Sequence, residues 1–372
     1  GFKRALRLKP KDAAAAYGKA ALRKPDAVEM HRTHGTLLEK LGRHAEAIAA
    51  WDKAVKLDEE DHKTLTRLGV CHCRVENWAE ARKYLTRSVK IRPDVGEAFK
   101  ELGKACLELG DHDAAQEYLT SAIEIDSKWA VGYALAGRLH EAKGELAKAE
   151  ERLIKAVELA PDELSLAGLL GHVRVLLRKY AEAVVLLKSA VAADGEDGAR
   201  RVDYGTALLR LGEHEPAAEQ LRHAVRLLPR HAEAHALLGE AARGVDGALS
   251  EARAMITKAL ELDPAKTEWL RPLAEVQADL GDDAASSATW ERAIAAIPEQ
   301  SELFAGLGAA RQRLGEHEAS AAAYAKAVEL GGDDSASLLI DLGLGYVRAG
   351  QWERARDALM KCAELAPSEA RV

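Results

Sequence analysis

Cysteine is the residue type in this sequence best suited to bind a metal ion or to act as a nucleophile. Two of the four cysteines flank a histidine, as Cys71, His72 and Cys73, while Cys106 and Cys362 stand alone. In a helix, residues two positions apart point about 200° away from each other, so the thiols of Cys71 and Cys73 cannot bind one ion together. A structural zinc site needs four converging ligands. We therefore interpret all four cysteines as small helix-packing residues.

Two pairs of histidines have the spacing of neighbours on one helix face: His31 with His34, and His231 with His235. Neither pair is accompanied by a third ligand or by a glutamate that could act as a general base. The sequence also lacks a phosphate-binding glycine loop, a Gly-x-Ser-x-Gly turn and a nucleophile paired with a base. It therefore predicts no metal site, no cofactor and no catalytic residue, and we expect the chain not to be an enzyme.

Charge and hydrophobicity narrow the class of protein further. The chain has 53 Lys and Arg against 60 Asp and Glu, and this net charge of −7 argues against nucleic acid as the main partner. Hydrophobic residues make up 48% but aromatic residues only 5%, so the apolar residues are mostly helix-favouring Ala, Leu and Val. No stretch approaches the roughly 18 consecutive apolar residues that a membrane span needs. The composition predicts an all-α protein.

Prolines recur with a fixed period. Pro93, Pro161 and Pro229 are 68 residues apart, and Pro264 and Pro298 are 34 apart. A fixed period of this length indicates an array of identical small units. Counting back from each proline gives ten units of 34 or 35 residues over 28–369.

Each unit has the same internal spacing. A glycine stands eighth, a small residue follows twelve positions later, and a large apolar residue such as Trp51 or Leu85 comes four positions after that. This spacing resembles that of the tetratricopeptide repeat (TPR), and the resemblance covers about nine-tenths of the chain. The glycines are Gly35, Gly69, Gly103, Gly137, Gly171, Gly205, Gly239, Gly308 and Gly343.

Helix chemistry explains the unit. Apolar residues at repeat positions 4, 7 and 11, which are Phe99, Leu102 and Cys106 in the third unit, form one stripe of a first helix. The glycine allows a second helix to approach closely, and proline ends the unit because it cannot continue a helix. One such hairpin cannot bury both of its faces, so neighbouring units must stack. We predict an all-α fold, an α-solenoid of about ten helix-turn-helix units, and the resemblance implies a right-handed superhelix lined inside by the first helices.

The N-terminal residues 1–27 depart from the period. They contain two overlapping second-helix signatures whose prolines, Pro10 and Pro25, are 15 residues apart. Either this is a genuine half-repeat, or a segment about one helix long is missing between Lys11 and Asp12. We favour the missing segment because both halves otherwise obey the spacing.

Further departures occur near the C-terminus. Residues 370–372 are a tail too short for the polar capping helix that solenoids need, so we expect the array to belong to a longer protein or to be covered by something else. The segment 244–247 lengthens the turn of the seventh unit, and in the eighth unit Ala274 replaces the glycine. Pro272 stands inside the first helix of that unit and disfavours helix at Arg271. We interpret this junction as a bend, either a hinge or a rigid kink.

The resemblance places repeat positions 2, 5, 9 and 12 on the concave surface that binds partners. This stripe, which we call the concave stripe, is mixed in charge in units one to four, uncharged in units five and six, and acidic in units seven and eight. In a chain that is 30% charged, an uncharged strip is typical of an interaction site, although its small residues could instead serve only to allow tighter curvature. The uncharged positions are Ser165, Gly168, His172, Val175, Ala199, Val202, Thr206 and Leu209, and the acidic ones are Glu233, Glu240, Glu268 and Glu275, with Arg243 and Arg271 between them.

Two ligand modes of the family are weakened by a missing residue type. The carboxylate clamp that holds chaperone C-termini combines lysines and arginines with asparagines, and the superhelices of O-GlcNAc transferase-like proteins grip peptide backbone with an asparagine ladder. Asn77 is the only asparagine here, and we place it in a turn. We retain the basic residues as candidate contacts. The predicted partner-binding residues are Leu169, His172, Val175, Val202, Thr206, Leu209, Lys63, Arg67, Lys100, Lys104 and Arg138.

These features together predict a non-catalytic scaffold that binds a peptide or helical segment of a protein partner in its concave groove, within a multiprotein assembly. One alternative is a regulatory or substrate-docking arm of a larger enzyme whose catalytic domain lies outside this chain. Another is a purely structural spacer. Free cysteines in packing rows favour a reducing, cytoplasmic compartment.

Overall fold

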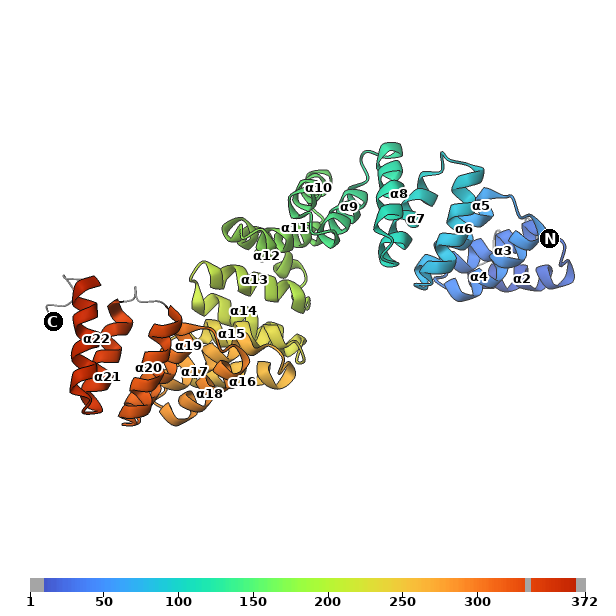
Figure 1. The fold of residues 1–372 in the computed structure, drawn as a ribbon. Coiled ribbons are helices and arrows are strands. Elements are labelled where there is room, and N and C mark those ends of the chain that lie inside the picture. Colours follow the sequence, from blue (N-terminus) through green and yellow to red (C-terminus); the bar gives the residue numbers. More distant parts are fainter. Residues whose placement is uncertain (1–9, 332–335, 366–372) are drawn as a thin grey trace. The chain divides into compact units, whose positions relative to one another are not determined.

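Residues 10–331 and 336–365 are described by a computed structural model (Figure 1). Within these residues there are 21 α-helices, one short 3-10 helix and no strand, so the prediction of an all-α solenoid is confirmed. The elements are α2 (Pro10–Arg23), α3 (Val28–Lys40), α4 (His44–Leu57), α5 (His62–Arg74), α6 (Trp78–Ile91), α7 (Gly96–Glu108), α8 (His112–Ile125), α9 (Ala130–Ala142), α10 (Leu146–Leu159), α11 (Leu164–Leu176), α12 (Tyr180–Ala193), α13 (Gly198–Arg210), α14 (His214–Leu227), α15 (Ala232–Arg243), α16 (Leu249–Leu262), η1 (Thr267–Trp269), α17 (Leu270–Asp279), α18 (Asp283–Ala296), α19 (Ser301–Arg313), α20 (His317–Gly331), α21 (Ala336–Arg348) and α22 (Trp352–Leu365).

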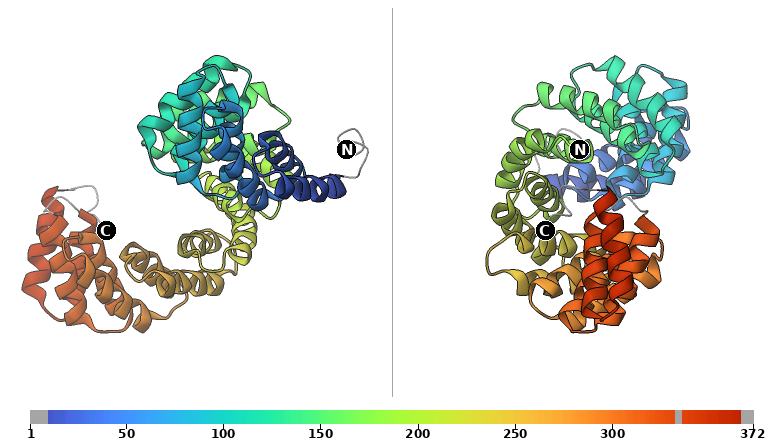
Figure 2. Two further views of the ribbon diagram at one scale, coloured as in Figure 1. Left: turned by 90° about the vertical axis from the view of Figure 1, so that its right-hand side faces the viewer. Right: turned by 60° about the vertical axis from the view of Figure 1, so that its left-hand side comes forward.

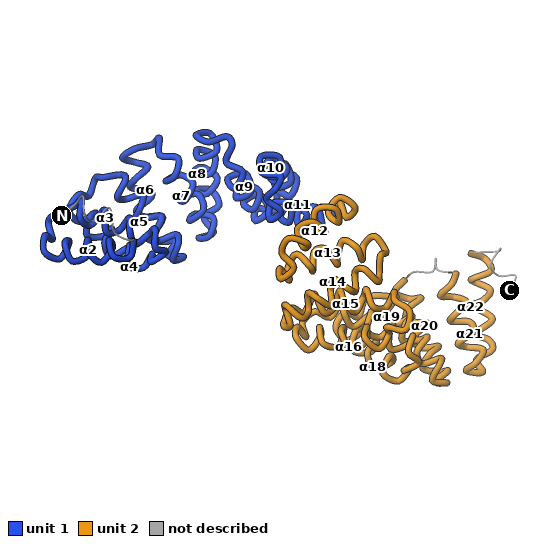
Figure 3. The backbone as a smooth tube through the Cα atoms, turned by 180° about the vertical axis from the view of Figure 1, so that it is seen from behind, with its two compact units in different colours: residues 1–178 blue, residues 179–372 orange. Residues whose placement is uncertain are grey.

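The chain divides into two compact units, residues 1–178 and residues 179–372 (Figure 3). In the first unit α3 pairs with α4, and so on to α9 with α10; in the second, α13 pairs with α14, and so on to α21 with α22 (Figures 1 and 2). Within each unit, every pair also packs against the next pair along the chain. Each unit therefore has its own core, built from helices that are close in sequence.

Most hairpin turns are closed by a glycine in the left-handed backbone region. Gly110 has a φ of +74° and its amide donates to the Leu107 carbonyl at 3.0 Å, while the Asp111 amide donates to Cys106 at 2.9 Å. These bonds satisfy carbonyls at the end of α7 that have no partner within the helix. Glu76 and Arg178 adopt the same conformation, each with a φ of +59°, at a strain that glycine avoids.

The glycine at repeat position 8 marks the closest approach of the two helices of a pair. A Cβ added to Gly239 in α15 would lie 2.4 Å from Ile256 Cγ1 and 3.0 Å from the Ala252 carbonyl oxygen, both in α16. Gly103 and Gly205 face Leu119 and Leu221 in the same way. The prediction that this glycine allows the second helix to approach is confirmed.

Alanine at this position should destabilise the fold, although alanine normally favours a helix. We expect Gly239→Ala to lower the free energy of unfolding by about 1–3 kcal/mol, because Ile256 and the α16 backbone must move away. The matched control is Gly345→Ala in α21, whose added Cβ would meet Ala321 at an ordinary 3.4 Å. There we expect a gain of about 0.4–1 kcal/mol. Urea denaturation followed by helical circular dichroism measures both changes, and equal effects would contradict this packing.

The cores are rows of small and large apolar residues from successive helices. In the first unit, Leu85 and Leu119 pack with Leu102 in one cluster, and each of these side chains is almost completely buried. In the second unit, Leu221 packs with Leu238 between α14 and α15. Burial of each such leucine contributes about 1.5–3 kcal/mol, so the stacking of neighbouring pairs stabilises what a single hairpin could not.

Of the two irregular regions, the structure corrects the interpretation of the one around Pro272 and leaves that of the N-terminal one untested. Lys11 and Asp12 both lie in the first turn of α2, while the first signature preceding Pro10 lies outside the described residues, so the missing segment stays a prediction. The expectation that Pro272 disfavours helix at Arg271 is wrong, because α17 contains both residues. Proline is tolerated there because the first four amide groups of a helix have no partner within the helix.

Candidate functional site

The cysteines are core residues whose thiols face different clusters. Cys71 packs with Leu65 and Leu68, whereas Cys73, two positions later, packs with Leu102. Burial raises the pKa of Cys71 and of Cys73 to about 12, and that of Cys106 to about 11, so the three thiols stay protonated at neutral pH. Such thiols are poor nucleophiles and poor metal ligands.

The histidines singled out by spacing form hydrogen bonds that hold the repeats together. His31 Nε2 is 2.9 Å from the Pro25 carbonyl oxygen, and His235 Nε2 is 3.2 Å from that of Pro229. His231 caps α15, where its Nδ1 accepts from the Ala234 amide at 3.1 Å. Each of the two pairs therefore contains a histidine ring that hydrogen-bonds to the backbone of its own repeat or of the preceding turn. This role in packing accounts for the histidines without a metal ion.

The basic candidates in the first unit contact acidic or aromatic neighbours. Arg67 lies 3.1 Å from Glu97, Lys100 lies 2.7 Å from Asp126, and Arg138 lies 3.4 Å from Glu108. The Lys100 ammonium holds the pKa of Asp126 below its usual value and lies 4.9 Å from the centre of the Trp129 ring. Lys104 lies 5.5 Å from the ring centre of Trp78, and Lys63 is exposed. A ligand carboxylate at this surface must therefore compete with carboxylates of the protein itself.

The uncharged candidates are divided between the two units. Leu169, His172 and Val175 are half-buried in α11 of the first unit, and Val202 and Thr206 are half-buried in α13 of the second. Thr206 Oγ1 donates to the Val202 carbonyl at 2.8 Å.

Leu209 needs a correction. We expected it at the surface of the concave stripe, but it is only 5% exposed and belongs to the core cluster of α13, α14 and α15. A glutamate at this position would bury a charge and unfold the helices, so it cannot test binding. Val202, which packs at the edge of that cluster, remains a suitable test position.

A cavity of about 400 Å³ opens on the concave stripe of the second unit. It lies between α15 and α17, and its floor includes Leu237, Ile256 and Trp269. Most of the charged side chains that line it stand at concave-stripe positions of the seventh and eighth repeats. Those stripe residues are Glu233, Ala236, Glu240 and Arg243 from α15, with Arg271 and Glu275 from α17.

Charges in this cavity are paired across the repeats. Arg243 bonds to Glu275 and also reaches Asp279 at 3.1 Å, and Arg271 lies 3.0 Å from Glu275. Burial opposes the charged form of Arg243, but its hydrogen bonds to these carboxylates raise its pKa overall. Glu240 forms an ion pair with Arg210 of α13, in which Glu240 Oε1 lies 2.5 Å from Arg210 Nη1. The cavity therefore presents an apolar floor between fixed charges of both signs, which suits a polar peptide with an apolar anchor.

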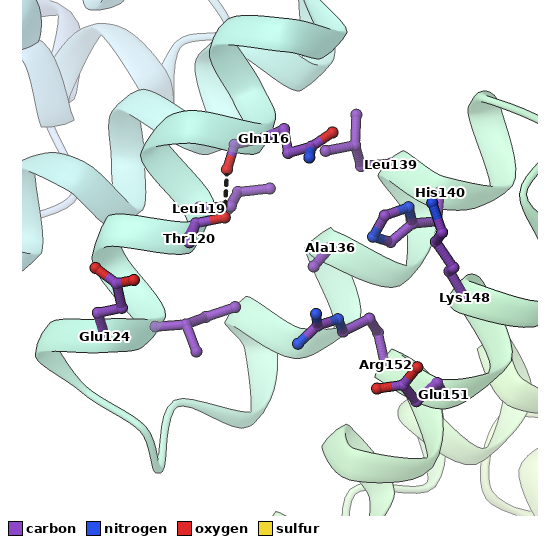
Figure 4. A pocket seen from close by; sticks show the side chains of 11 residues that line it. Gln116, Leu119, Thr120, Glu124, Ala136, Leu139, His140, Lys148, Glu151 and Arg152 are labelled. Carbon is purple, nitrogen blue, oxygen red and sulfur yellow. Dashed lines mark hydrogen bonds between the residues drawn. The ribbon is translucent and has the colours of Figure 1, made fainter.

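A second cavity, of about 570 Å³, lies in the first unit and was not predicted from the sequence (Figure 4). Its walls are α8 and α10 and its floor is α9, so it belongs to the second helices and not to the concave stripe. Its apolar part consists of Leu119, Ile123, Ala136 and Leu139. Along one wall, Thr120 Oγ1 donates to the Gln116 carbonyl (Figure 4).

Stacked helix pairs with cavities on their faces define the class of this protein, a helical repeat scaffold. Four family models described as tetratricopeptide repeat match residues 7–62, 60–128, 130–163 and 176–241. The chain belongs to the tetratricopeptide repeat family.

Several solved structures are similar to this chain. PilF of Pseudomonas aeruginosa is 19% identical, with a TM-score of 0.50, over 59% of this chain and 98% of that one. YrrB, a TPR protein with an unusual peptide-binding site, is 22% identical over 50% of this chain and 96% of its own, with a TM-score of 0.45. Cut9–Hcn1, an APC/C hetero-tetramer, is 14% identical over 96% of this chain and 84% of its own, with a TM-score of 0.42. At 19% identity the similarity to PilF shows the fold alone.

No curated protein sequence matches this chain. Among the described residues, none of the helices has the length and apolar character needed to cross a membrane. The repeats imply protein partners for a scaffold of this family.

Proposed function

We propose that this chain is a non-catalytic scaffold that binds an extended or helical peptide segment of a protein partner on its concave stripe. The observation that carries the proposal is the cavity between α15 and α17. It is lined by the same repeat positions that the family resemblance assigns to ligand binding. Val202 and Thr206 extend this surface onto α13, the helix that also supplies Arg210 to the cavity.

The chemistry of the surface selects the kind of peptide. Leu237, Ile256 and Trp269 offer an apolar floor, while Glu233 is exposed at its edge. An apolar side chain buried on this floor would contribute about 1.5–3 kcal/mol, and a basic residue beside it would complement Glu233. We propose an apolar–basic motif as the recognised element. Leu169, His172, Val175 and the basic candidates of α5, α7 and α9 are proposed as further contacts in the first unit, and the four free cysteines support a reducing compartment.

Selection of random twelve-residue peptides displayed on phage against the full chain tests this function. We expect enriched peptides to carry an apolar residue next to lysine or arginine. We expect Val202→Glu to weaken their binding at least tenfold, because apolar burial at Val202 is lost. We expect Glu233→Arg to weaken it by a similar factor, because the charge that faces the basic residue of the peptide is reversed. Fluorescence polarisation with a labelled selected peptide measures this change.

The matched control is Val185→Glu on α12, because Val185 is 70% exposed and lies off the stripe. It should bind as the unchanged chain does, and circular dichroism should show the same helicity for all variants. Selected peptides that bind equally well to both stripe variants would contradict the proposed surface.

A further inference from the structure

The cavity between α8 and α10 is lined by a side chain, Arg152, whose repeat position carries tyrosine in the two repeats before it. At repeat position 23 the second and third repeats carry Tyr84 and Tyr118, whereas the fourth carries Arg152. The Tyr84 ring stacks on His72 at repeat position 11, with ring centroids 5.6 Å apart and planes 11° from parallel. In the fourth repeat His140 occupies the position of His72, but no aromatic ring of its own repeat stands at position 23.

The position of the His140 ring is fixed by burial and by one polar contact. His140 is 8% exposed, and its Nδ1 lies 2.7 Å from Glu145 Oε2. That contact fixes the ring and lowers the pKa of Glu145. Lys148 also lines the cavity, and its Nζ lies 3.2 Å from Glu145 Oε2. Figure 4 shows the His140 ring directed toward the open space between the walls.

Arg152 is the unpartnered group of this cavity. Within residues 10–331 and 336–365 it is the one half-buried arginine that has neither a carboxylate nor another hydrogen-bond acceptor within reach. Its guanidinium points into the cavity in Figure 4. Guanidinium groups bind carboxylates with two parallel hydrogen bonds and stack on aromatic faces. The half-buried arginines that do have partners are Arg32, Arg87, Arg174, Arg200, Arg201, Arg222 and Arg311.

The rim limits the charge that can enter. Glu124 on α8 and Glu151 on α10 are exposed at opposite sides of the cavity (Figure 4). Two carboxylates at the rim of a cavity with one unpartnered guanidinium disfavour a phosphate or any other multiply charged anion. A group with one negative charge and a large apolar body suits the cavity better.

We propose that the α8–α10 cavity is a second binding site, which takes an aromatic side chain of a partner segment together with an adjacent carboxylate. The aromatic ring occupies the place that Tyr84 has in the second repeat, stacked on His140 against Leu119 and Leu139. The carboxylate pairs with Arg152. This site is separate from the concave stripe, so one scaffold holds two segments at once.

4-Hydroxyphenylacetate, a tyrosine side chain joined to one carboxylate, tests the site in saturation-transfer NMR with the full chain. We expect binding at millimolar concentration, weakened about tenfold in Arg152→Gln, which removes the charge-assisted pair. We expect Arg152→Tyr to abolish binding, because its ring fills the cavity as Tyr84 does in its own repeat. Helicity and the free energy of unfolding should be maintained in Arg152→Tyr, which separates filling from unfolding.

Two matched probes separate the parts of the proposal. Acetate lacks the ring and phenol lacks the carboxylate, so each should bind at least tenfold more weakly than the complete probe. Signal that persists in Arg152→Tyr places binding elsewhere and overturns the assignment, as does the absence of any signal with the unchanged chain. Inorganic phosphate binding as strongly as 4-hydroxyphenylacetate overturns the stated ligand chemistry.

Discussion

Leu221→Ala should lower the free energy of unfolding of the second unit by about 2–5 kcal/mol. Leu221 in α14 is completely buried, and its side chain lies against Gly205 in α13 and packs with Leu238 in α15. Truncation leaves a cavity shared by three helices, and because repeats are stabilised by their neighbours, both repeats weaken together. Urea denaturation followed by circular dichroism at a helical wavelength measures the loss.

The control for this change is Val185→Ala on α12, where the side chain is 70% exposed. Removal of methyl groups from a solvated side chain should alter stability by less than about 0.5 kcal/mol. Equal losses in the two variants would contradict the assignment of the large residues at repeat position 24, such as Leu221, to the core.

Thiol reactivity should differ by orders of magnitude between the folded and unfolded chain. Burial raises the pKa of Cys71 from 9.0 to about 12, and Cys73 is shifted in the same way. At pH 8 the thiolate fraction then falls from about a tenth to about one in ten thousand, so reaction with dithionitrobenzoate should slow about a thousandfold or more. Stopped-flow absorbance in buffer and in guanidinium chloride measures both rates.

The same shift makes stability depend on alkaline pH. The folded chain retains thiol protons that the unfolded chain releases, so this contribution is complete below pH 9 and is lost as the pH rises toward 12. Cys71→Ser is the informative variant, since serine does not titrate in this range. Fast reaction of Cys71 in the folded chain would mean that its helix opens readily, contrary to the packing described above.

The sequence predicted the helical repeat well because its signals are local. A glycine at position 8 faces the large residue at position 24 of the same repeat, as Gly103 faces Leu119, so a spacing of sixteen residues reports a contact directly. The orientation of Cys71 and Cys73 followed from helix geometry for the same reason.

The candidate site was harder to predict because it depends on what neighbouring repeats leave uncovered. Leu209 was placed on the surface by its repeat position, but its burial is decided by α14 and α15. The α8–α10 cavity had one signal in the sequence, the change from Tyr84 and Tyr118 to Arg152 at position 23. That signal becomes meaningful only once His140 is known to lie beside it.

The glycine-closed hairpins also determine how the chain would respond to tension. Each hairpin is completed by bonds within a few residues, such as those of Gly110 and Asp111, and its other contacts are with adjacent hairpins. Because these contacts reach only the adjacent hairpins, a pulled chain can unfold locally, from a repeat and its weakened neighbour, without disrupting repeats further along. Each unfolded repeat of 34 residues would add about 110–120 Å of extended chain, so we expect a stretched chain to lengthen in steps of about this size.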